Sequence, residues 1–188
     1  MSDTGPRRTK PNRATERRPS LVLVNTGDGK GKTTAALGTA MRSAGAGLKV
    51  CVIQFLKSGK WKTGEEAAGR RLGIDWWSLG DGFTWDSKNM DETEARARAA
   101  WEKAKDAITG GAYQLVVLDE VTYPVTWGWI DEADVVSTVR ARPEHVNVII
   151  TGRGASAGLL DLADTATEMT KLKHAFDSGV KALKGVDF

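Results

Sequence analysis

A glycine-rich segment near the start of the chain combines the residue types that bind phosphate groups. Residues 26–34 read Thr-Gly-Asp-Gly-Lys-Gly-Lys-Thr-Thr and follow the apolar run Leu21–Asn25. Glycines permit positive φ angles and a close approach of backbone amides, and the N-terminus of a following helix favours anionic oxygens. A lysine adds a point charge, and a threonine hydroxyl suits Mg²⁺. We therefore expect phosphate contacts from Gly27, Asp28, Gly29, Lys30, Gly31, Lys32, Thr33 and Thr34.

The match to the strict P-loop spacing is imperfect at one position. The form G-x4-G-K-T would place a glycine where Thr26 stands. A glycine turn with a purely structural role is the alternative, but such a turn has no need of Lys32 and Thr33 side by side. We therefore predict a phosphate-binding loop, with Thr33 as one metal ligand.

Two acidic residues follow a second apolar run and complete the expected metal site. Val116–Leu118 precedes Asp119 and Glu120. Open α/β sheets bind their ligands at the carboxyl ends of the strands, so Asp119 or Glu120 is placed to complete the shell of Mg²⁺ or Mn²⁺. Acidic residues at strand ends also serve solubility, so the two acids alone are weak evidence for a metal site. Together with the glycine-rich loop they become strong evidence.

Two arginines are further candidates for contact with a nucleotide. Arg153 comes two residues after the apolar run Val146–Thr151, beyond Gly152, so it is expected at the same crevice, where a cation suits a triphosphate. A surface arginine in a turn is the alternative. Arg42 lies ten residues after Lys32 on the expected first helix. It either reaches the nucleoside or is an ordinary charge on the helix surface.

An aromatic loop is the motif that ordinary ATPase chemistry explains least. Phe83 and Trp85 lie within the segment Gly80–Asp86, between glycines and polar residues, at the expected ligand face. Exposed aromatic side chains on a loop suit a flat, apolar partner. Trp127 and Trp129 follow the acidic strand and are candidates for the same surface. Packing as a small satellite core beneath a loop is the alternative.

The elements that would position these residues alternate along the chain. Apolar runs at 21–25, 49–56, 74–79, 113–118 and 146–151 predict strands, with an edge strand at 166–169. Helical periodicity is found at 33–43, 63–72, 91–109, 131–140 and 159–163. We expect an α/β fold of the P-loop NTPase kind, a doubly wound, mainly parallel sheet of about six strands with helices on both faces.

Charge separates the chain into a tail and a domain. The net charge is +3, but residues 1–20 alone carry +4, so the remainder is nearly neutral. We expect a flexible basic tail at 1–20, either solvated or folded over an anionic ligand, and one domain at 21–188.

Cys51 lies in an apolar run and is expected to be a buried strand residue. The chain shows no apolar run of membrane-spanning length and no signal peptide, which predicts a cytoplasmic protein without a membrane partner.

The sequence resembles the P-loop ATP:corrinoid adenosyltransferases of bacteria. The resemblance extends over nearly the whole chain from Leu21 onward, and the family also carries threonine at the position of Thr26. It rests on the segments Thr26–Thr34, Gly82–Trp85, Val116–Glu120 with Thr122 and Tyr123, Val148–Gly154, Lys173–Asp177 and Gly179–Lys181.

The resemblance implies a reaction in which Co(I) of a reduced corrinoid attacks the ribose 5′-carbon of ATP and releases triphosphate. The loop, Arg153 and the metal would then stabilise the leaving group. Phe83 and Trp85 would be the catalytic pair that removes an axial ligand and makes cobalt four-coordinate, which eases reduction from Co(II). The resemblance also implies an electron-donating reductase and a homodimer, with the tail folded over the corrinoid. Cobalamin, cobinamide and cobyrinic acid a,c-diamide remain open as acceptors.

Two other functions are consistent with parts of the sequence. A hydrolytic ATPase or a kinase would use the same loop, but no residue is identified that would orient water or an acceptor hydroxyl. His145 is interpreted as structural, and neither it nor His174 has an evident catalytic partner. A nucleic-acid-binding module would use the basic tail and the tryptophans. The nearly neutral domain argues against nucleic acid as a partner.

Overall fold

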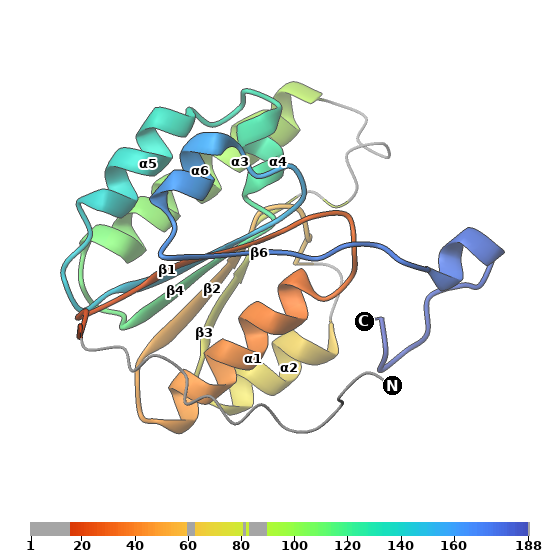
Figure 1. The fold of residues 1–188 in the computed structure, drawn as a ribbon, viewed down its shortest axis with the longest axis horizontal. Coiled ribbons are helices and arrows are strands. Elements are labelled where there is room, and N and C mark those ends of the chain that lie inside the picture. Colours follow the sequence, from red (N-terminus) through yellow and green to blue (C-terminus); the bar gives the residue numbers. More distant parts are fainter. Residues whose placement is uncertain (1–15, 60–62, 81, 83–89, 188) are drawn as a thin grey trace, which may run out of the picture.

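A single parallel sheet forms the centre of the structure. The computed structural model describes residues 16–59, 63–80, 82 and 90–187. The strands lie in the order β3-β2-β4-β5-β1-β6, and every neighbouring pair is parallel (Figure 1). The prediction of a parallel sheet of about six strands is confirmed. In chain order the strands are β1 (Val22–Thr26), β2 (Val50–Gln54), β3 (Asp75–Ser78), β4 (Leu115–Asp119), β5 (Asn147–Thr151) and β6 (Thr165–Glu168).

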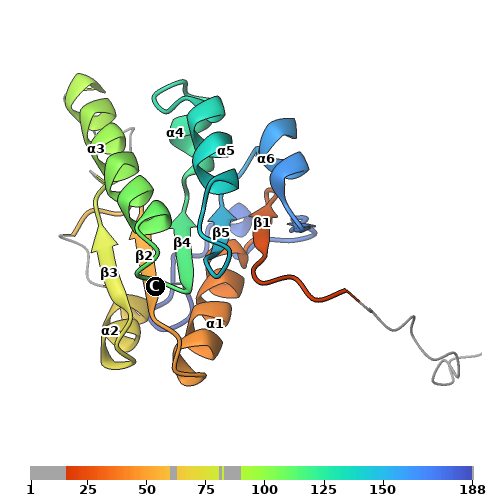
Figure 2. The ribbon, with the colours of Figure 1, turned by 90° about the vertical axis from the view of Figure 1, so that its left-hand side faces the viewer.

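Helices cover both faces of this sheet, as a doubly wound fold requires. One face carries α1 (Lys32–Gly45) and α2 (Gly64–Arg71), and the other layer holds the remaining α-helices (Figures 1 and 2). These are α3 (Met90–Thr109), α4 (Thr122–Thr126), α5 (Glu132–Arg140) and α6 (Ala157–Leu162), and a short 3₁₀ helix, η2 (Ala175–Ser178), follows β6.

The apolar runs of the sequence form strands that are buried on both faces. In β4, Leu115 and Val117 pack in the core on the α1 side, whereas Val116 and Leu118 pack in the core on the α3 side. All five residues of β4 are buried. Successive side chains of a strand point to opposite faces, so a continuous apolar run fits a sheet with helices on both sides. The polar residues at the ends of the central strands are thereby attached to strands packed on both faces.

Some boundaries and one helix differ from the sequence prediction. The fourth strand begins at Leu115 rather than at Tyr113, whose hydroxyl instead donates a hydrogen bond to Asp75 Oδ2 at 2.8 Å. The helix α4 was not predicted, because it has five residues and contains Pro124, too few to show a helical period. Strand β6 lies at the sheet edge and is exposed throughout.

The strand order sets which elements meet at the carboxyl edge of the sheet. Strands β1 and β4, which lead into the glycine loop and the acidic pair, are separated by β5. Residues at the end of β5 therefore lie between the two motifs.

Among the described residues, no helix has the length and hydropathy needed to cross a membrane.

The two-sided burial of the strands predicts a strong effect of one core truncation. Ile150 on β5 is fully buried, so Ile150→Ala should lower the free energy of unfolding by about 2–5 kcal/mol. Met41 on α1 is 53% exposed, and Met41→Ala should change it by less than about 1 kcal/mol. Urea unfolding followed by circular dichroism measures both. Equal losses in the two variants would contradict the assigned core.

Candidate functional site

The glycine-rich loop joins the end of β1 to the start of α1. Gly27 and Gly31 have φ angles of 91° and 112°, which other residues rarely adopt. Gly31 is the N-cap of α1, no side chain caps it, and the first turn contains no acidic residue. The amides at this helix end and the helix dipole therefore favour an anion.

Lys32 turns back over the loop and places its ammonium group at the loop's centre. Its Nζ donates to the carbonyl oxygens of Gly27 at 2.7 Å and Gly29 at 2.6 Å. Burial is the main cause that lowers the pKa of Lys32, and the positive charge of Arg153 adds to it. An anion in the loop would relieve both effects, because it supplies the opposite charge at short range.

Asp119 connects the loop to three strands through a fully buried carboxylate. Its Oδ1 accepts hydrogen bonds from Thr33 Oγ1 at 2.7 Å and from Thr151 Oγ1 at 2.8 Å. Its Oδ2 accepts a hydrogen bond from Gln54 Nε2 at 2.9 Å, and Lys57 Nζ lies 4.0 Å from the same oxygen. The structure thus brings two predicted metal ligands, Thr33 and Asp119, into direct contact.

Glu120 lies beside this carboxylate in an unusual backbone conformation. Its φ is 65°, and it is the only described residue other than glycine with a positive φ. Its amide donates to Thr151 Oγ1 at 2.9 Å, which ties the turn to β5. Burial raises the pKa of Glu120 to about 7, and the charge of Asp119 adds to the rise, while Lys57, Lys32 and Arg153 oppose it.

Arg153 lies at the same edge, whereas Arg42 does not. Arg153 Nε is 3.8 Å from Asp28 Oδ1, and both side chains are exposed. The Arg153 carbonyl accepts a hydrogen bond from Thr122 Oγ1 at 2.7 Å. Arg42 is exposed in the last turn of α1, at the opposite end of the helix from Lys32, roughly 15 Å away at the helical rise. Its contact with the nucleoside stays a prediction.

Backbone groups after β6 also belong to the site, although no sequence pattern indicated them. Gly29 N donates to Met169 O at 2.6 Å, and Met169 N donates to Thr26 O at 2.8 Å. A Cβ on Gly27 would lie 2.5 Å from Met169 O, so this position requires glycine. A cavity of about 490 Å³ opens between the loop, residues 154–155 and β6.

The C-terminal segment also contacts the glycine-rich loop, because Lys30 forms an ion pair with Asp187.

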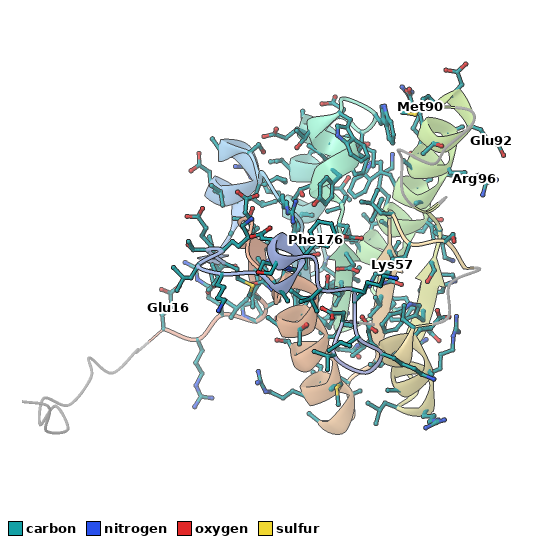
Figure 3. The ribbon with its side chains drawn as sticks, turned by 90° about the vertical axis from the view of Figure 1, so that its right-hand side faces the viewer. Glu16, Lys57, Met90, Glu92, Arg96 and Phe176 are labelled. Carbon is teal, nitrogen blue, oxygen red and sulfur yellow. The ribbon has the colours of Figure 1, made fainter. Side chains whose placement is uncertain are left out.

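The predicted aromatic pair, Phe83 and Trp85, lies outside the described residues. The flanks of that loop are nevertheless placed. Gly80 N donates to Lys57 O at 3.1 Å, and Gly82 N donates to Leu56 O at 2.9 Å. The base of the loop therefore lies beside Lys57, whose ammonium group approaches Asp119. Figure 3 shows Lys57 and Phe176 on the same face of the molecule.

The other aromatic and titratable candidates have defined places in the structure. Trp127 and Trp129 form a tilted ring pair with centroids 4.6 Å apart, and Trp127 is 39% exposed. His145 Nε2 lies 2.9 Å from the Gly111 carbonyl oxygen, and His174 Nδ1 accepts a hydrogen bond from the Phe176 amide at 3.0 Å. Cys51 is buried as predicted, and burial raises the pKa of its thiol.

The donor set at the carboxyl edge suits a hard divalent cation. Thr33, Asp119 and Glu120 offer oxygen atoms only, and Mg²⁺ commonly uses one or two carboxylates together with substrate phosphates. In the part of the chain that the structure describes, no three His, Cys, Asp or Glu residues gather as a protein-only metal cage. The arrangement is thus a glycine-rich loop, a buried carboxylate and the cations Lys32, Lys57 and Arg153 at one sheet edge.

Comparison with known proteins identifies the group to which the chain is related. The family model described as ATP:corrinoid adenosyltransferase BtuR/CobO/CobP matches residues 18–188. The chain belongs to this family. It is 45% identical over 168 residues to the corrinoid adenosyltransferase CobA of Salmonella typhimurium, covering 89% of this chain and 85% of that protein. Corrinoid adenosyltransferases of Escherichia coli K12 and Pseudomonas aeruginosa are 44% and 42% identical, covering 85% and 83% of their lengths.

Membership in the adenosyltransferase family confirms the predicted activity. The protein is a transferase that moves the adenosyl group of ATP to a corrinoid, and both molecules are its substrates. The hydrolytic ATPase and kinase interpretations of the glycine loop are therefore replaced by alkyl transfer. The sequence motifs indicated the loop, the acids and the segment around Arg153 as candidates, and the structure brings them together, but no motif indicated Gln54, Lys57 or Met169.

The raised pKa of Glu120 predicts a pH dependence of stability. Between pH 4.5 and about 7 the folded protein keeps a proton that the unfolded chain has released. The free energy of unfolding should therefore fall as the pH rises through this window, by an amount on the order of 1–3 kcal/mol. Glu120→Gln should remove this component. Urea unfolding at several pH values measures it in both proteins.

These titrations require protein without nucleotide or divalent cation, because either would change the charge around Glu120. The difference between the wild type and Glu120→Gln should be largest above pH 7. Parallel stability curves for the two proteins would show that the carboxyl group is not held in its protonated form.

Proposed function

We propose that the carboxyl edge of the sheet holds ATP by its triphosphate and treats that triphosphate as a leaving group. The observation that carries this is the convergence of Lys32, the Thr33–Asp119 pair and Arg153 around one glycine loop. Co(I) of the corrinoid attacks the ribose 5′-carbon, the carbon–oxygen bond to the triphosphate breaks, and the bonding electrons leave with that oxygen. Cations and amides at the loop stabilise the charge that develops there.

The remaining loop residues have supporting parts in this proposal. Gly27, Gly29 and Gly31 let the backbone approach the phosphates, and the amides of Thr33 and Thr34 lie at the helix N-terminus. Asp28 and Lys30 are tied to Arg153 and Asp187 respectively, which holds the rim of the loop. Arg42 is a candidate contact only if the nucleoside extends along α1.

We assign the metal site to Thr33, Asp119 and Glu120, with Mg²⁺ or Mn²⁺ as the ion. The buried position of Asp119 and the oxygen-only donor set support this assignment. When bound, the cation would neutralise charge on the leaving triphosphate. The protein's own contribution is to keep Thr33 and Asp119 in contact before any ligand arrives.

The corrinoid is proposed to bind beside Lys57, with Phe83 and Trp85 displacing its lower axial ligand. The hydrogen bonds from Gly80 and Gly82 to residues 56–57 support this, because they anchor the aromatic loop next to the nucleotide site. The exposed face of Trp127 offers a further apolar contact. The basic tail at 1–20 is proposed to close over the corrinoid, and residues 21–188 form the catalytic domain.

Assembly and supply of the reactants complete the proposal. Leu172, Phe176 and Val186 are 95%, 75% and 76% exposed, and a second copy of the chain in a homodimer would cover apolar surface of this kind. A separate reductase supplies the electron that converts Co(II) to Co(I).

Because ATP is a substrate, we place the reaction in the cytoplasm. Cobalamin, cobinamide and cobyrinic acid a,c-diamide are the candidate acceptors, and their relative kcat/KM values would rank them.

Product analysis tests the leaving-group role of the triphosphate. The protein, ATP, Mg²⁺ and chemically reduced cob(I)alamin are incubated without oxygen, and corrin spectra and phosphate chromatography follow the reaction. We expect an adenosylated, light-sensitive corrin together with inorganic triphosphate. Lys32→Ala should lower kcat/KM by about 100-fold or more, because it removes a charge aimed at the leaving group.

Arg71→Ala is the matched control, since Arg71 is an exposed cation at the end of α2. It should leave kcat/KM within about two-fold of the wild type, as ordinary surface substitutions do. Accumulation of ADP and phosphate without alkylation of the corrin would overturn the proposal.

The starting oxidation state of cobalt separates the role of the aromatic pair from that of the loop. Phe83→Ala and Trp85→Ala should lose most activity when the reaction starts from Co(II) with a reductase. Both should retain most of it when the reaction starts from chemically reduced Co(I), because the step they assist has then been bypassed. Equal losses from both starting states would assign the pair to binding alone.

A further inference from the structure

A buried glutamine side chain lies against the carboxylate at the centre of the site. Gln54 is the last residue of β2 and is 1% exposed. Its Nε2 donates to Asp119 Oδ2 at 2.9 Å. Its Oε1 accepts hydrogen bonds from Trp76 Nε1 at 3.0 Å and from Ser78 Oγ at 2.9 Å. Gln54 therefore connects the edge strand β3 to the acidic end of β4.

The neighbours of Gln54 determine which way its amide points. The indole Nε1 of Trp76 is a donor only, so the group facing it must be the amide oxygen. An ionised Asp119 is an acceptor only, so the group facing it must be the amide nitrogen. A flipped amide would set donor against donor and acceptor against acceptor. Both ends of the amide are thus specified by buried partners.

The orientation of Gln54 in turn fixes the plane of the Asp119 carboxylate. Oδ1 faces Thr33 and Thr151, and Oδ2 is held on the opposite side by Gln54. Without the Nε2 donor, Oδ2 would keep only Lys57, whose Nζ is 4.0 Å away and whose side chain is partly exposed. The orientation of the carboxylate would then depend on the two hydrogen bonds that Thr33 and Thr151 donate to Oδ1.

We propose that Gln54 is a positioning residue that holds Asp119 ready for the divalent cation and that Trp76 and Ser78 hold Gln54 in turn. This inference rests on the proposed metal role of Asp119. The Gln54 amide bonds to Asp119, Trp76 and Ser78, so in this proposal it acts on the cation through Asp119. It acts by keeping Asp119 Oδ1 aimed at Thr33, so that the site does not spend binding energy on ordering its ligand.

The test measures metal binding directly, without turnover. Mn²⁺ is titrated into an equimolar mixture of protein and ATP, and electron paramagnetic resonance counts the free ion. The same titration of ATP alone is subtracted, because ATP binds Mn²⁺ in solution. Gln54→Met keeps the side-chain length but removes the amide, and it should weaken Mn²⁺ binding about ten-fold or more. The double variant Trp76→Phe with Ser78→Ala keeps Gln54 but releases its oxygen, and it should weaken binding about three-fold.

Tyr113→Phe is the matched control. It removes a hydroxyl that donates to Asp75 on the same edge strand, away from Asp119. It should leave Mn²⁺ affinity within about two-fold of the wild type, and KM for cob(I)alamin should change little in all of these variants. A purely structural role of Gln54 would instead lower thermal stability and leave the metal affinity unchanged.

The outcomes separate the two proposals. If the wild type with ATP binds no more Mn²⁺ than ATP alone does, the metal assignment itself fails. If the wild type binds Mn²⁺ and the Gln54→Met and double variants bind it as tightly as Tyr113→Phe does, the positioning role of Gln54 is overturned. Should Gln54→Met not fold, the double variant decides, because it retains the amide and removes both donors to its oxygen.

Discussion

The buried carboxylate of Asp119 is the interaction on which the arrangement of the site depends. It is fully inaccessible to solvent, and a buried charge of this kind persists only where donors surround it. Its donors come from α1, β5 and β2, so three separate elements are held in register by one side chain. A displacement of any of them would leave a polar atom without a partner in a region of low dielectric constant.

The strand order explains why the glycine loop and the acidic pair cannot be positioned independently. Strand β5 lies between β1 and β4, and its last residue, Thr151, donates to Asp119 while accepting from the Glu120 amide. The next residue, Gly152, packs against Thr122, where any Cβ would lie 2.0 Å from the hydroxyl oxygen. Arg153 is thereby delivered to the loop by the same turn that supports the acids.

Sequence reasoning found the residues whose chemistry is visible in their type and position. Lys32, Thr33, Asp119 and Arg153 follow apolar runs, and parallel strands bring their carboxyl ends to one edge. The sequence analysis places Gln54 inside the predicted strand 49–56, because Phe55 and Leu56 continue the apolar run after it. A polar side chain at the last position of a buried strand is the signal that could have indicated it.

Contacts made by the backbone could not be found in this way. Met169 supports the loop through its amide and carbonyl, which every residue except proline possesses, so its identity carries no information about the contact. Helix α4 escaped prediction because five residues do not define a period. The metal, the aromatic pair and the dimer remain proposals, since they depend on ligands, loop positions or a second chain.

The position of β1 in the sheet has a consequence for how the enzyme is made. Strand β1 is the first strand to leave the ribosome, yet both of its neighbours, β5 and β6, are the last two to be synthesised. The glycine loop at its end is likewise fastened by Met169, more than a hundred residues later in the chain. Pairings of such long sequence separation form late. A nascent chain therefore carries the complete loop sequence through most of translation without a strand on either side of it, and the contacts that hold the loop form only after β5 and β6 have been synthesised.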